Sequence, residues 1–168
     1  MKTSWLSGRR SSGGFTLAEV CVALAIVTIV TIGAFNVFLS FARSYNTSTL
    51  MRTASTRASL GLERMVYGVG TNMGLREAVA SSVAVTYSNT TDWTLTYSNA
   101  LDTAVKSFTY STSKKSITDW AGKTICTNVV SSTATDLTTG CQITLSVTES
   151  AGGRTLSNSM MTFVQFRN

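Results

Sequence analysis

Hydrophobic residues are concentrated in one block near the start of the chain. Residues 20–42 contain no charged side chain and lie between Glu19 and Arg43. A helix of this length reaches roughly 35 Å, which is enough to cross the hydrocarbon core of a bilayer. A buried core helix is the alternative, but the rest of the chain has too little apolar sequence to surround it. The block therefore predicts a membrane-spanning helix.

Beyond Arg43 the pattern changes from uniformly apolar to periodic. Apolar residues recur at intervals of three or four residues, or at a doubled interval, at Phe41, Tyr45, Met51, Ala54, Ala58, Leu62 and Met65. This spacing predicts that the helix continues over residues 43–67 as an amphipathic segment. Its apolar face needs a cover from elsewhere in the protein.

Short runs of alternating apolar and polar residues follow the helix. They predict strands at residues 83–88, 93–98, 104–111, 123–130, 142–148 and 160–167. Apolar side chains would occupy one face of the resulting sheet, and Ser and Thr the other. The alternative is a disordered Ser/Thr-rich stalk, but regularly spaced aromatic residues argue against it. A short helical piece at 75–80 and a turn at Gly152 and Gly153 are also expected.

The composition excludes several kinds of catalytic site. The chain has no histidine and no proline, 13% charged residues and a formal net charge of +6. Without imidazole there is no Ser-His-Asp triad, no Cys-His nucleophile pair and no histidine-ligated zinc. Asp92, Asp102, Asp119 and Asp136 lack the close spacing of a calcium loop. We therefore expect no enzymatic activity, no cofactor and no metal.

A basic leader and a short polar junction precede the apolar block. Residues 1–14 contain three basic residues and no acidic one, and residues 14–19 read GFTLAE. This junction resembles the cleavage and methylation site of the type IV pilin family, which includes the pseudopilins of type II secretion and the pilins of DNA-uptake machines. Four features coincide: Gly14 before the cut, Phe15 after it, Glu19 as the fifth mature residue, and the apolar helix.

The resemblance implies how the chain is processed. A prepilin peptidase would remove the leader, residues 1–14, and methylate the new N-terminus at Phe15. Loss of the three basic leader residues lowers the formal charge from +6 to +3, before the new amine is counted. Residues 15–42 would then be both membrane anchor and assembly helix, and Glu19 would pair with the N-terminus of a neighbouring subunit. A carboxylate at this depth usually has a partner, although an acid near a helix N-terminus is favourable even without one.

The resemblance also implies fold and function. The expected fold is α+β, with the helix over 43–67 packed on a small antiparallel sheet from residues 75–168. The expected protein is a minor pilin or pseudopilin that resembles the J-type. A single membrane-spanning helix would hold it in the bacterial inner membrane, with its C-terminal domain exported. It would then join other pilin subunits in a periplasmic or surface filament. Asn36 stands where major pilins commonly have a proline, which favours a minor subunit.

Two alternatives to a filament subunit of this kind remain open. One is a DNA-binding pilin of a competence system. Its DNA would bind a basic patch formed by the scattered residues Lys114, Lys115, Lys123, Arg154 and Arg167. The other is a membrane-anchored domain that never polymerises and keeps its leader. Both alternatives have the same membrane helix as a filament subunit, so they differ from it only in what the chain does after it is inserted in the membrane.

The three cysteines divide between the membrane helix and the exported part. Cys21 lies in the apolar block, where we expect a small packing residue. Cys126 and Cys141 are fifteen positions apart in the part expected outside the cytoplasm, where an oxidising compartment favours pairing. A disulfide closing this loop would stabilise the domain by about 3 kcal/mol in the chain-entropy model. Two free buried thiols are the alternative.

Overall fold

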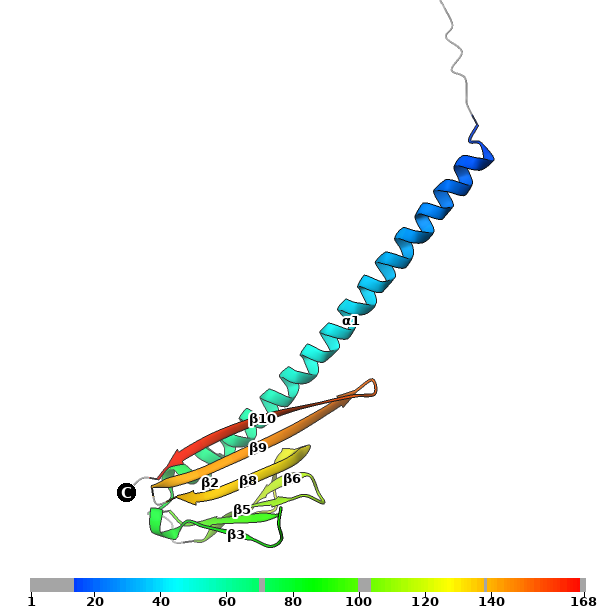
Figure 1. The fold of residues 1–168 in the computed structure, drawn as a ribbon. Coiled ribbons are helices and arrows are strands. Elements are labelled where there is room, and N and C mark those ends of the chain that lie inside the picture. The colour runs from blue at the N-terminus through cyan, green and yellow to red at the C-terminus, as the bar shows by residue number, and fades with distance from the viewer. Residues whose placement is uncertain (1–13, 70–71, 100–103, 138, 167–168) are drawn as a thin grey trace, which may run out of the picture. The chain divides into compact units, whose positions relative to one another are not determined.

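The computed structural model of the chain describes residues 14–69, 72–99, 104–137 and 139–166. The chain divides into two compact units, Met1–Ser44 and Tyr45–Asn168. One helix, α1 (Leu17–Tyr67), runs from the first unit into the second, and the described strands belong to the second (Figure 1). The structure therefore has the α+β composition expected from the sequence, one long N-terminal helix followed by antiparallel sheets.

The first unit consists of the apolar part of α1. The helix passes through Gly33 and Asn36 without interruption. Two hydroxyl groups in this apolar stretch donate to the preceding turn: Thr28 to the Leu24 carbonyl and Thr31 to the Val27 carbonyl, both at 2.7 Å. Because these hydroxyls are satisfied within the helix, they need no water or polar neighbour.

In the second unit, α1 is buried along one face only near its end. The buried residues are Ala54, Ala58, Gly61, Leu62 and Met65. Phe41, Tyr45 and Met51 were expected on the covered face, but all three are exposed. The periodicity identified the buried side of the helix correctly from Ala54 onward. The apolar spacing starts at Phe41, however, whereas the buried residues begin only at Ala54.

Eight strands form two antiparallel sheets in the second unit. The five-stranded sheet has the order β3 (Ala84–Tyr87), β4 (Trp93–Tyr97), β5 (Lys106–Ser111), β6 (Ser116–Asp119) and β7 (Thr124–Thr127). The three-stranded sheet has the order β10 (Arg154–Gln165), β9 (Gly140–Ala151) and β8 (Val129–Leu137). A small pair, β1 (Gly68–Val69) and β2 (Asn72–Met73), and two 3₁₀ turns, η1 (Leu75–Glu77) and η2 (Ala80–Ser82), connect α1 to the sheets. The sequence predicted one small sheet, and the described residues form a five-stranded and a three-stranded sheet besides the β1–β2 pair.

The expected strands differ from the observed ones in extent, most strongly over β6, β7 and β8, and most of β8 was not predicted. The run at 123–130 is split into β7 and β8 at Asn128, whose φ of 61° interrupts the extended chain; asparagine tolerates this left-handed conformation better than most residues. Strand β6 was not predicted. The turn expected at Gly152 and Gly153 is present, with φ values of 58° and 74° that suit glycine, and it joins the twelve-residue strands β9 and β10.

Tyrosine side chains join the two sheets. The Tyr87 hydroxyl, from β3, donates to the Ala134 carbonyl in β8 at 2.8 Å and accepts from the Ala134 amide at 3.2 Å. The Tyr110 hydroxyl donates to the Val130 carbonyl at 3.1 Å. These contacts satisfy backbone groups on the outer edge of β8 that would otherwise have no strand partner.

The hydroxyl-rich composition is explained by the outward face of the three-stranded sheet. Ser131, Ser146 and Ser159 lie opposite one another across β8, β9 and β10. The inward-facing neighbours in β9 are instead apolar and fully buried: Ile143, Leu145 and Val147. Strand β9 thus alternates between a core face and a mainly hydroxyl face, which is the pattern of a half-exposed antiparallel sheet. The outward face of β10 also carries the exposed Met161 and Phe163.

The structure does not contain the expected disulfide. Cys126 lies in β7 of the five-stranded sheet and Cys141 in β9 of the three-stranded sheet, and both are free, buried thiols. The Cys126 thiol faces the Arg57 carbonyl at 3.7 Å, and the Cys141 thiol faces the Gln142 carbonyl at 3.9 Å. The spacing of the two cysteines in the sequence sets the length of the loop between them. It does not show that they lie in strands of different sheets.

Candidate processing and assembly site

The expected cleavage site lies just before the first helical residue. Gly14, Phe15 and Thr16 have no regular secondary structure, and α1 begins at Leu17. All three are exposed, and 86% of Phe15 is accessible. The Gly14–Phe15 peptide bond is therefore outside the helix. It lies in exposed, non-helical backbone, which a peptidase can reach.

A reciprocal cap fixes where the helix starts. The Thr16 backbone amide and hydroxyl both donate to Glu19 Oε2, at 2.9 and 3.1 Å. In return, the Glu19 amide donates to the Thr16 hydroxyl at 3.3 Å. This is a capping box, in which a threonine at the N-cap and a glutamate three residues later satisfy each other's amides. Thr16 is thus a member of the site that the sequence analysis missed, although the T-x-x-E spacing before an apolar run was visible there.

Glu19 is exposed, and its hydrogen bonds within the described residues come from Thr16 alone. Both of these bonds end on Oε2, so the second carboxylate oxygen is left for another partner. An ion pair of the described residues lies elsewhere, between Arg57 and Glu149. The geometry is compatible with a cation supplied from outside the chain, and a protein amine is one such cation.

The helix after Glu19 presents apolar side chains on all sides. It is long and apolar enough to cross a membrane, and none of its most apolar window is buried. The exposed members include Leu24, Ile26, Val27, Ile29, Val30, Ile32, Phe35 and Phe38. A soluble monomer rarely exposes a continuous apolar surface of this size. The surface is of the kind that lipid or other apolar helices cover.

The described basic residues considered for DNA binding come from different parts of the second unit. Lys114 and Lys115 precede β6, whereas Lys123 follows it, so they lie at opposite ends of that strand. Arg154 begins β10 and donates to the Thr47 hydroxyl of α1 at 3.3 Å. Arg167 lies outside the described residues. No group of three or more potential metal ligands occurs in the part of the chain that the structure describes.

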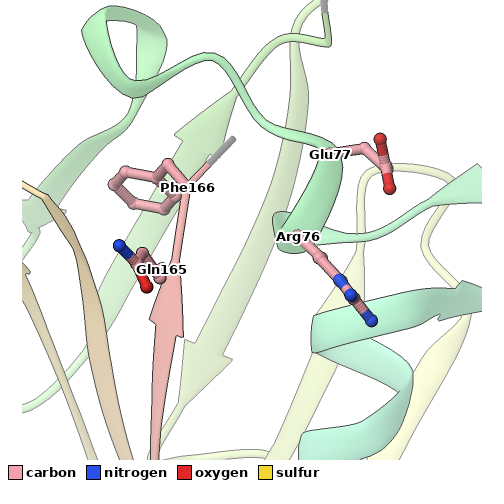
Figure 2. A pocket seen from close by; sticks show the side chains of 4 residues that line it. All are labelled: Arg76, Glu77, Gln165 and Phe166. Carbon is pink, nitrogen blue, oxygen red and sulfur yellow. The ribbon is translucent and has the colours of Figure 1, made fainter. Parts of the chain in front are cut away.

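A polar pocket of about 450 Å³ lies in the second unit, between η1 and the end of β10. Figure 2 shows its lining side chains: Arg76 and Glu77 from η1, Gln165 at the end of β10, and Phe166 directly after it. The Arg76 guanidinium lies over the Tyr67 ring, 5.6 Å from its centre, so the pocket is bordered by a cation held on an aromatic ring. It shares no residue with the N-terminal site.

Comparison with known proteins bears on the N-terminal site. Residues 9–35 match the family model described as the prokaryotic N-terminal methylation motif. The match includes Gly14, Phe15, Thr16 and Glu19 and the first part of the apolar helix, so the resemblance inferred from the sequence is confirmed. No curated protein and no solved structure matches the chain. The chain therefore carries the N-terminal methylation motif that is the hallmark of type IV pilin and pseudopilin precursors.

Proposed function

We propose that this chain is a minor pilin or pseudopilin subunit. A prepilin peptidase cuts it after Gly14 and methylates Phe15, and the mature chain is held in the bacterial inner membrane by residues 15–42 with its C-terminal part exported. The subunit then joins other pilin subunits in a type IV pilus or a type II secretion pseudopilus. The observation that carries the proposal is a methylation motif followed at once by a fully exposed apolar helix.

Glu19 gives the proposal its molecular mechanism. Its carboxylate is held at the helix N-terminus by Thr16, through one oxygen only. A methylated amine at Phe15 of a neighbouring subunit is a cation of suitable size for the other oxygen. In an apolar surrounding such a pair is far stronger than in water, so Glu19 sets the position of each subunit against the next.

Processing is tested by expressing the chain with a prepilin peptidase and measuring the mass of the product. The expected mature chain begins at Phe15 and carries one methyl group. A chain that keeps Met1 would exclude processing and would favour a membrane-anchored domain that does not polymerise.

Assembly is tested separately with Glu19→Ala, measured by co-purification with the other pilin subunits. The variant should be cleaved like the wild type but should no longer co-purify. Glu63→Ala is the matched control, because Glu63 is an exposed acid on the same helix but outside the apolar segment. Normal assembly of the Glu19 variant would contradict the mechanism.

A further inference from the structure

A groove of about 290 Å³ lies between α1 and the edge strand β7, within the second unit. Arg57, Leu60 and Arg64 line it from the helix, and strand β7 lines it from the other side. Among the described residues β7 pairs only with β6. The outer edge of β7 therefore has a helix beside it but no further strand.

The two arginines of the groove are held in position but keep free donors. Arg57 Nη1 lies 2.6 Å from Glu149 Oε1, and Arg64 Nη1 donates to the Ile125 carbonyl at 3.1 Å. A guanidinium has five N–H donors, so one contact leaves several for a ligand. The Arg57 side chain is still 43% exposed. Because these contacts fix the side chains in advance, binding costs less conformational entropy.

An apolar side chain lies between these two cations. Leu60 follows Arg57 by three residues and precedes Arg64 by four, so all three share one side of the helix. Leu60 is 43% exposed, whereas Ile125 and Cys126 of β7 are buried. Glu149, the acidic group next to the groove, is already paired with Arg57. The groove thus offers an exposed leucine between Arg64 and an Arg57 that is already paired with Glu149, along a strand edge that has no further strand beside it.

We propose that this groove docks an extended, acidic segment of a neighbouring pilin-type subunit. Carboxylates of the segment pair with Arg57 and Arg64, and an apolar side chain packs on Leu60. Arg57, Arg64 and Glu149 together carry one net positive charge, so charge complementarity selects an acidic partner. Arg64 occupies the Ile125 carbonyl of β7, but no strand covers the rest of this edge, and the groove beside it suits an extended peptide. The inference rests on the proposed function, because filament assembly is what brings another subunit to this surface.

Two labelled peptides test the groove: acetyl-Glu-Val-Glu-Val-Glu-amide and its counterpart with Gln in place of Glu. They are titrated with the whole mature chain, residues 15–168, in detergent, and binding is followed by fluorescence polarisation. The acidic peptide should bind about tenfold more tightly at low salt and lose this advantage as salt is raised. Equal affinities for the two peptides would overturn the proposal.

Leu60→Glu places a carboxylate between the two arginines and should abolish the preference for the acidic peptide. Met51→Glu is the matched control, because Met51 is 44% exposed on the same helix and does not line the groove. Thermal unfolding of both variants checks that they fold like the wild type. A folded Leu60→Glu chain that still prefers the acidic peptide would also overturn the proposal.

A single-stranded DNA oligonucleotide is titrated as a third probe. If it binds the groove in preference to the acidic peptide, the arginines serve phosphate and the proposal fails. Failure here is distinct from failure of the proposed function, since cleavage after Gly14 and co-purification depend on the N-terminal helix. A chain that is cleaved and co-purifies, yet does not discriminate between the peptides, refutes the groove alone.

Discussion

Thr16 and Glu19 close the first turn of α1 between them, with hydrogen bonds of 2.9, 3.1 and 3.3 Å. The pair has two consequences for a membrane-inserted chain. It places the start of the helix after the Gly14–Phe15 bond, and it satisfies one oxygen of a carboxylate that adjoins an apolar segment. Under the proposed function, one short motif thus links the removal of the leader to the joining of subunits.

Thr16→Val should loosen this first turn without changing the shape of the side chain. The hydroxyl that caps the Glu19 amide is lost, and so is one of the two donors to Glu19 Oε2. We expect the Glu19 amide to exchange with solvent about fivefold faster, as for the loss of an ordinary N-cap. Hydrogen exchange of the detergent-solubilised chain measures this, and Thr16→Ser should exchange like the wild type.

Gly61 is a point of close contact between α1 and the sheets. A side-chain carbon added there would lie 3.0 Å from Cys126 Cβ and 3.2 Å from Leu145 Cδ2. Gly61→Val should therefore lower the free energy of unfolding by about 1 to 3 kcal/mol, the usual cost of overpacking a core. Denaturant unfolding followed by tryptophan fluorescence reports it.

Gly33→Val is the control for the Gly61 variant. Gly33 lies in the same helix, and an added carbon there would meet nothing within 4 Å. The substitution should leave the unfolding of the second unit unchanged. If Gly61→Val also unfolds like the wild type, the close packing of α1 on β7 and β9 is contradicted.

The parts of the fold that were predicted from the sequence are those with a strong repeating pattern. The apolar block and the spacing from Ala54 to Met65 are continuous signals, so the helix was recognised. Strand β6 was missed because it contains a single large apolar residue, Ile117, next to two lysines. Most of β8 was missed for a related reason, since its inward positions Ser132 and Ala134 are small.

The features that the sequence did not predict depend on where separate elements meet. Periodicity shows which side of a helix is apolar, but not how far a sheet extends along it, so Tyr45 was expected to be covered and is exposed. The N-terminal methylation motif was recognisable because it is local: Gly14, Phe15 and Glu19 are neighbours in the chain. The groove beside β7 was not, since it needs Arg57 and Arg64 next to a strand some sixty residues away.

Tyr87→Phe should weaken the connection between the two sheets. The variant keeps the ring but removes the hydroxyl that bonds both the amide and the carbonyl of Ala134, a buried residue. Leaving buried backbone groups without partners costs about 1 to 3 kcal/mol. We expect a lower denaturant midpoint with an unchanged slope. Tyr45→Phe, at a tyrosine that is exposed on α1, should have no effect.

Cys126 and Cys141 should be free and unreactive thiols in the folded protein. Burial raises the pKa of both, and that of Cys141 to about 12, to which the negative charge of Asp136 also contributes. Because the thiolate is the reactive form, alkylation at pH 8 should be very slow until the chain unfolds. In a Cys21→Ala chain prepared without reductant, iodoacetamide should label no cysteine in the native state and both after denaturation. A denatured chain that takes up no label would show that the disulfide expected from the sequence forms after all.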